Sequence, residues 1–383
     1  MSLDPDTLEQ FLDTLDRFVR ERLIPNEHKV AEEDAIPMGL IQEIKDIGLF
    51  GLSIPEEYGG LGLTMSEEVA AAFILGQASP VFRSLIGTNN GIGSQGIIID
   101  GSPEQKQMYL PCLATGEMIA SFALTEPDAG SDAGSLKTSA RRDGNDFVLN
   151  GTKRFITNAP HAGLFTVFAR TDPTSKTSAG VSAFLIEADT PGLSLGAIDK
   201  KMGQKGSHTS DVILDDCRVP ASAILGAEGQ GFKTAMKVLD RGRLHISAVC
   251  VGAAERLIRD SLAYAMDRKQ FGGPLSDKQL IQAMLADSKA EAYGARCMIE
   301  ETARRKDAGR KVTTEAACCK LMASEMVGRV ADRAVQIHGG AGYMAEYAVE
   351  RFYRDVRLFR IYEGTSQIQQ LLIARNMISD AAA

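Results

Sequence analysis

The stretch DFVLNGTKRFITNA, residues 146–159, separates this chain into parts with different periodicity. Its β-branched and aromatic residues form two short runs around Asn150-Gly151, a dipeptide that favours a hairpin turn. Prolines and glycines separate it from three further β candidates, LFTVFAR (164–170), VSAFLIEA (181–188) and DVILDDCRVP (211–220). Residues 121–230 are therefore predicted to form a compact, barrel-like β-domain.

Helical periodicity occupies both sides of this β-region. Residues 8–23 place their apolar side chains on one helical face, and helical segments continue to residue 120. Those segments are expected to break at PEEYGGLGL (55–63) and at the glycine-rich GTNNGIGSQG (87–96).

The helical period returns after residue 230, with long patterns at 232–269, 276–306 and 313–338. The sequence therefore predicts an α+β fold with three domains. These are an N-terminal helical domain (1–120), the central β-domain (121–230) and a C-terminal helical bundle (231–383).

Composition excludes several classes of protein. The net charge is −8 with no block of Lys or Arg, which argues against a nucleic-acid partner. No apolar run is long enough to span a bilayer, so membrane insertion is not expected. The six cysteines form no Cys-x-x-Cys pair, and the five histidines are scattered. This pattern favours a reduced, cytoplasmic protein without a metal site.

Two common nucleotide-binding architectures do not fit the chain either. A doubly wound fold alternates strands with helices and carries a Gly-x-Gly-x-x-Gly after its first strand. Here the glycine-rich stretches do not follow a strand, and no P-loop motif occurs.

A single carboxylate stands out in RIYEGTSQIQ, residues 360–369. Gly364 and Thr365 indicate that one element ends and a short amphipathic helix begins, which places Glu363 in the turn between them. On its own, a glutamate at a helix start is most simply a solvated charge.

The chain as a whole resembles the acyl-CoA dehydrogenase family. The resemblance rests on five motifs in order, SFALTEPDAGSD (121–132), NGTKRFITNA (150–159), DRKQFGGPLSDKQ (267–279), QIHGGAGY (336–343) and RIYEGTSQIQ (360–369). It implies a flavoenzyme with a C-terminal four-helix bundle and FAD held between the β-domain and the helices. It also implies an acyl-CoA substrate, electron transfer to an electron-transfer flavoprotein, and a homotetramer built as a dimer of dimers.

The resemblance assigns residues to each role. Those expected at FAD are Phe122, Leu124, Thr125, Ser131, Phe155, Thr157, Arg268, Phe271, Gln336, Gly339, Gly340, Thr365 and Gln367. Those expected at the substrate are Ser131, Asp240, Arg243, Tyr362 and Gly364.

Simpler interpretations exist for several of these residues. Pro127 to Gly130 would form a turn without any ligand. Strand alternation would place Phe155 and Thr157 on one face for packing, Arg268 would be a surface ion-pair partner, and Asp240 and Arg243 would be a helix-face pair.

Glu363 is the expected general base of the implied reaction. The α-hydrogen of a thioester is a poor acid, and burying the carboxylate against an apolar acyl chain makes it a better base. Some relatives carry their base at the position that Gly242 occupies here, and a glycine cannot take a proton.

The acyl group is less well indicated. Gly91 and Gly93 are expected to leave space at the bottom of the pocket, which favours medium or branched chains. Arg83 aligns with an arginine that binds the distal carboxylate in glutaryl-CoA dehydrogenases, although a surface arginine near a helix end is the simpler interpretation. A same-fold oxidase and a catalytically silent binding protein are the alternative functions.

Overall fold

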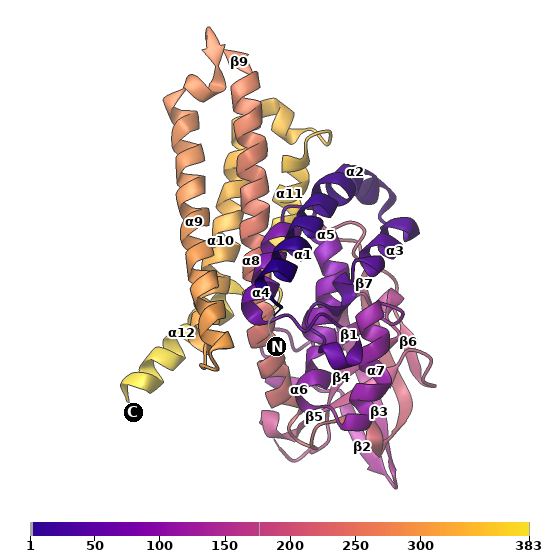
Figure 1. The fold of residues 1–383 in the computed structure, drawn as a ribbon. Coiled ribbons are helices and arrows are strands. Elements are labelled where there is room, and N and C mark those ends of the chain that lie inside the picture. Colours follow the sequence, from indigo (N-terminus) through magenta and orange to yellow (C-terminus); the bar gives the residue numbers. More distant parts are fainter. Residues whose placement is uncertain (1–2, 176, 383) are drawn as a thin grey trace.

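The computed structural model describes residues 3–175 and 177–382, and the predicted α+β class is confirmed (Figure 1). The chain runs through N-terminal helices, a β-sheet and C-terminal helices in that order. The N-terminal helices are α1 (Pro5–Phe18), α2 (Ile24–Glu33), α3 (Met38–Asp46), α4 (Met65–Leu75), α5 (Pro80–Gly87), α6 (Gln95–Asp100) and α7 (Pro103–Thr115). No helix within the described ranges combines the length and apolar character needed to cross a membrane.

The central sheet follows the order β6-β7-β3-β2-β4-β5-β8, with β1 paired to β4. Its main strands are antiparallel, except that β1 and β2 run parallel to β4. The strands are β1 (Ala120–Ala123), β2 (Ser139–Asp143), β3 (Asp146–Thr157), β4 (Leu164–Arg170), β5 (Val181–Glu187), β6 (Leu193–Leu195), β7 (Thr209–Pro220) and β8 (Ile224–Leu225).

The expected hairpin turn at Asn150-Gly151 is wrong, because both residues lie inside β3. The register with β7 shifts between Leu149 and Gly151, which marks a bulge rather than a chain reversal. The Asn150 side chain exchanges two hydrogen bonds with Asp216 on β7, at 2.9 and 2.8 Å. This cross-strand contact uses the same side chain that would otherwise favour a turn.

The α-helix is interrupted at the glycine-rich residues 87–96, as expected, since α5 ends at Gly87 and α6 begins at Gln95. Thr88–Gly93 form a buried π-helical turn that joins α5 to α6. Two asparagine amides tie this turn to distant segments: Asn89 donates to the Leu113 carbonyl at 2.9 Å and Asn90 to the Leu49 carbonyl at 2.6 Å. A Cβ on Gly93 would lie 2.8 Å from the Ala120 Cβ, so this glycine allows β1 to pack closely.

The C-terminal helices are α8 (Gly231–Asp267), α9 (Gln279–Asp307), α10 (Thr313–His338), α11 (Ala348–Val356) and α12 (Ser366–Ala381). The three longest lie side by side, as Figure 1 shows, and share an apolar core with α4 and α11. A short hairpin of β9 (Lys269–Gln270) and β10 (Gly273–Pro274) connects α8 to α9 at the end of the bundle. Thr365 caps α12, as predicted, but Leu371 and Ile378 on that helix are exposed.

A buried charge network joins α4 to α8. Glu68 contacts Arg241 and accepts a bond from His245 Nδ1 at 2.9 Å. Burial alone would raise the pKa of Glu68, but the Arg241 guanidinium and the bond from His245 lower it from 4.5 to about 2. That difference corresponds to about 3 kcal/mol of stability at neutral pH.

We expect Glu68→Gln to lose this stabilisation at neutral pH. Because the folded-state pKa is lowered, the contribution of Glu68 is fully present above about pH 4.5 and declines as the pH falls towards 2. The free energy of unfolding, measured by denaturant titration, should therefore differ between wild type and variant by about 3 kcal/mol at pH 7 and by progressively less below pH 4. A pH-independent difference would contradict this assignment.

Candidate active site

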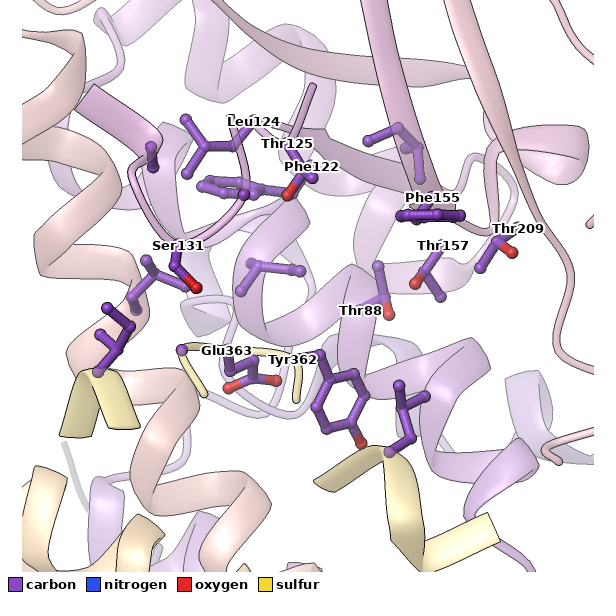
Figure 2. Close-up of a pocket in the computed structure, with 18 of the residues that line it drawn as sticks. Thr88, Phe122, Leu124, Thr125, Ser131, Phe155, Thr157, Thr209, Tyr362 and Glu363 are labelled. Carbon is purple, nitrogen blue, oxygen red and sulfur yellow. The ribbon is translucent and has the colours of Figure 1, made fainter. Parts of the chain in front are cut away.

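One cavity of about 520 Å³ lies where the β-sheet, α8 and the turn before α12 meet. Figure 2 shows Tyr362 and Glu363 on one side of it, facing Leu124, Thr125 and Phe122 from the β-domain. Ten of the predicted site residues line the cavity: Phe122, Leu124, Thr125, Ser131, Phe155, Thr157, Arg243, Tyr362, Glu363 and Gly364. Residues from three distant parts of the sequence therefore converge on one space.

The turn that carries Glu363 has an unusual backbone. Glu363 has a φ of 53° and Gly364 a φ of 90°, so two consecutive residues are left-handed. This conformation is costly for a glutamate and is typically retained at functional sites. Gln369 Nε2 donates to the carbonyls of Glu363 and Gly364 at 3.2 and 3.1 Å. The turn is thus fixed by the helix that follows it.

Arg83 contacts Glu363 at the cavity wall, so the interpretation of Arg83 as a surface residue is wrong. Arg83 is only 4% exposed, and its Nη2 lies 3.2 Å from Glu363 Oε1. Burial by itself would lower the pKa of Arg83, but the facing carboxylate outweighs this effect and leaves the pKa raised. The guanidinium is therefore a permanent cation inside the pocket.

This ion pair and the neighbouring Tyr362 carry buried polar atoms that lack hydrogen-bond partners among the described residues. Arg83 Nε, Tyr362 Oη and Glu363 Oε2 have no hydrogen-bond partner among the described residues. The three residues that carry these atoms line the cavity, and buried polar groups are normally satisfied, so the missing partners favour a polar ligand at this end. The Ser84 hydroxyl, which donates to Gln204 Oε1 at 2.9 Å, adds another polar group to this end.

Two glycines make room for the ion pair. A Cβ on Gly242 would lie 2.6 Å from Glu363 Oε2, and a Cβ on Gly87 would lie 2.6 Å from Arg83 Nε. The expectation that Gly91 and Gly93 open the pocket is not met, since Thr88 and Ile92 are the lining residues of that segment.

Phe155 reaches the cavity because β3 contains a second bulge. The register with β7 shifts between Lys153 and Ile156, and Phe155 has a φ of 58°. A bulge redirects a side chain that regular alternation would keep on the sheet face. The Phe155 ring is 59% exposed, so it offers a large apolar surface to a ligand.

The segment that carries Leu124 and Thr125 is fixed by a buried ion pair. Lys153 Nζ lies 2.7 Å from Glu126 Oε1, and Glu126 also accepts bonds from the backbone N–H groups of Lys137 and Thr138. The Arg154 N–H donates to the Thr125 carbonyl at 2.8 Å. The cavity wall is therefore rigid on this side.

The loop after this segment is built from small residues. Gly130, Ser131, Ala133, Gly134 and Ser135 all line the cavity, and a Cβ on Gly130 would meet no atom within 4 Å. A loop of this kind leaves space for a phosphate chain to approach the backbone closely. The residues present therefore fit a cofactor that has both a flat ring and a pyrophosphate.

Several predicted residues lie away from the cavity. Arg268 and Phe271 lie on the hairpin at the end of the bundle, and Gln336, Gly339 and Gly340 lie at the end of α10. About 25 residues of helix separate Arg243 from Arg268, a distance of ~37 Å.

Thr365, Gln367 and Asp240 are close in sequence to lining residues but do not line the cavity themselves. Arg243 and Asp240 form the expected helix-face pair at 2.6 Å.

Sequence reasoning missed several residues at the site. Lys201 and Gln204 line the cavity from the loop before β7, and Phe232, Met236 and Leu239 line it from α8. The helical spacing of the last three was the only available signal, and it also fits ordinary core packing.

Known protein families match nearly the whole length of this chain. Three family profiles match in order: the N-terminal domain of acyl-CoA dehydrogenase (residues 5–117), its middle domain (121–217) and its C-terminal domain (229–378). The chain is 43% identical to an acryloyl-CoA reductase (NADH) of Anaerotignum propionicum, over 94% of this chain and 92% of that protein.

Two solved structures are similar over nearly the full length. Butyryl-CoA dehydrogenase from Megasphaera elsdenii is 35% identical with a TM-score of 0.94, covering 99% of this chain and 100% of that chain. Glutaryl-CoA dehydrogenase from Mycobacterium smegmatis is 33% identical with a TM-score of 0.92, covering 98% and 95%.

Proposed function

Because this chain belongs to the acyl-CoA dehydrogenase family, which implies a flavin cofactor, we propose that it converts an acyl-CoA thioester to the trans-2-enoyl-CoA. The observation that carries the proposal is the position of Glu363. Its carboxylate is buried at the cavity wall and held by a left-handed turn, with one oxygen facing Arg83 and the other without a hydrogen-bond partner among the residues that the structure describes. A carboxylate in this state is suited to accept the α-proton of a bound thioester.

The cofactor of the proposed reaction is FAD. When bound, it supplies at N5 an acceptor for the hydride that leaves Cβ. Phe122, Leu124, Thr125, Phe155 and Thr157 would hold its ring, and Ser131 its pyrophosphate. The rigid wall formed around Lys153 and Glu126 supports this assignment, because it keeps the backbone donors of the 122–125 segment in fixed positions.

The chain's own residues then perform the proton chemistry. Tyr362 forms a wall of the acyl site, and Arg243 and Gly364 line the cavity beside Glu363. The apolar side chains of Ile92, Leu239 and Ile368 line the same cavity and would exclude water from the reacting carbons.

A homotetramer is proposed because five predicted FAD residues cannot reach the cavity of their own chain. Phe271 is 94% exposed at the bundle end, as expected for a side chain that covers a ligand in a neighbouring subunit. An electron-transfer flavoprotein is the proposed electron acceptor. Six free cysteines support a cytoplasmic location.

The proposal is tested by following the acyl-CoA product by mass spectrometry with an artificial electron acceptor. Formation of a product two hydrogens lighter supports dehydrogenation. An acceptor-independent reaction that consumes O2 and releases peroxide would instead identify an oxidase. Absence of any product from short, medium, branched and dicarboxylyl thioesters would contradict the proposal.

A second candidate concerns the acyl group itself. Arg83 is a buried cation at the acyl site, and Tyr362 lines the same cavity. Within the described part of the chain, neither Arg83 Nε nor Tyr362 Oη has a hydrogen-bond partner. A purely apolar acyl chain would leave these groups unsatisfied, whereas a distal carboxylate would pair with the guanidinium. We therefore propose a dicarboxylyl-CoA of the glutaryl type as the favoured substrate class.

We expect Gly242→Ala to slow α-proton removal by about 10- to 100-fold, because the new Cβ displaces the Glu363 carboxylate and small misplacements of reacting groups are costly. The rate of flavin reduction measures this effect. Gly294→Ala is the matched control, since Gly294 is also in a long helix and its Cβ would meet no atom within 4 Å. Equal rates for the two variants would show that the close approach at Gly242 has no role.

A further inference from the structure

Helix α10 contributes no residue to the cavity lining, but it holds the turn around Glu363. Lys320 Nζ donates to the Gly364 carbonyl at 2.8 Å. One turn further along α10, Glu325 accepts a bond from the Ser366 hydroxyl at 2.6 Å and contacts Arg360. Two residues of one helix therefore hold the chain before, within and after the turn.

Lys320 is an unusual residue to find at this place. It is 1% exposed, in the middle of the bundle core, and the Gly364 carbonyl is the only hydrogen-bond acceptor found for it among the described residues. Burying an ammonium group with one neutral partner costs free energy that an apolar side chain of equal length would not. Burial accordingly lowers the pKa of Lys320 to about 8.

The bond from Lys320 lies at a part of the turn where the backbone is left-handed at two consecutive residues. Gly364 has a φ of 90°, and it follows a glutamate with a φ of 53°. Gln369 holds the same carbonyl from within α12, but Lys320 is the donor that ties it to α10. Without Lys320, the peptide between Gly364 and Thr365 would be held only by Gln369, from within α12, and the turn that carries the Glu363 carboxylate would lose this support from α10.

We propose that Lys320 is a positioning residue for the base: through the Gly364 carbonyl, it holds the left-handed turn that aims the Glu363 carboxylate into the cavity. This inference rests on the proposed function of Glu363. It extends that function to a residue that does not itself line the cavity.

Lys320→Met tests this role because it keeps the length of the side chain and removes the donor. The fold should persist, since the substitution also removes a buried charge. We expect flavin reduction at saturating acyl-CoA to slow by at least about tenfold, with substrate affinity changed much less, since misaligned reacting groups lower the rate of the chemical step. Backbone hydrogen exchange in a peptide that covers residues 361–366 should accelerate, while α10 itself stays protected.

Val330→Ala is the matched control, because Val330 is a buried residue of α10 that belongs to the bundle core. Val330→Ala should lower the melting temperature without accelerating hydrogen exchange at the turn. The rate of flavin reduction per folded protein should stay unchanged. Unchanged exchange in Lys320→Met, or faster exchange with an unchanged rate of reduction, would overturn the positioning role. If no acyl-CoA reduces the flavin of the wild-type protein, the proposed function would instead be overturned. The hydrogen-exchange experiment would still report on the turn.

Discussion

Glu363→Gln is expected to retain FAD and lose about 10³-fold or more in the rate of flavin reduction by acyl-CoA, in the range typical of removing a general base. Glutamine keeps the size of the side chain, and its amide can still face Arg83. It cannot accept a proton from the α-carbon. Rapid mixing of the FAD-loaded variant with substrate, followed in the visible flavin band, measures the effect directly.

The Glu363→Gln result is interpretable only if the cavity stays intact. A substrate-induced change in the flavin spectrum with normal affinity would show that the variant still binds the thioester. Reduction at a rate within a few fold of wild type would mean that another group takes the proton. The base assignment would then be wrong.

Arg83→Met is expected to lower kcat/KM for glutaryl-CoA by about 100-fold or more, since truncating one partner of a buried charged contact costs about 2–5 kcal/mol. The same variant should lower kcat/KM for butyryl-CoA much less. Methionine fills much of the space of the arginine, so the pocket loses its cation without collapsing. Comparing the two substrates on one variant is the internal control.

The Arg83 test depends on the ratio of the kcat/KM values for the two substrates. Arg83 also lies 3.2 Å from Glu363, so its loss will affect the base for every substrate to some extent. That shared effect cancels when kcat/KM for glutaryl-CoA is divided by kcat/KM for butyryl-CoA. An unchanged ratio would assign Arg83 to Glu363 alone and would remove the argument for a dicarboxylyl substrate.

The order of the elements was readable from the sequence because it depends on local periodicity. The long patterns at 232–269, 276–306 and 313–338 correspond to α8, α9 and α10, whose apolar residues recur at helical spacing. The position of Glu363 in a turn before a helix was also predicted, since Gly364 and Thr365 are strong local signals.

The errors arose where tertiary contacts overrode local signals. Asn150-Gly151 forms a bulge because Asp216 on another strand binds the asparagine side chain. Arg83 is buried because a carboxylate 280 residues away faces it. No single-sequence pattern contains such long-range partners.

The proposed function is tested most directly by the visible spectrum of the FAD-loaded protein during anaerobic addition of glutaryl-, butyryl-, octanoyl- and isovaleryl-CoA. The flavin band should bleach, and glutaryl-CoA should bleach it at the lowest concentration. A protein that binds no FAD, or a flavin band that none of the four thioesters bleaches, would contradict the proposed function.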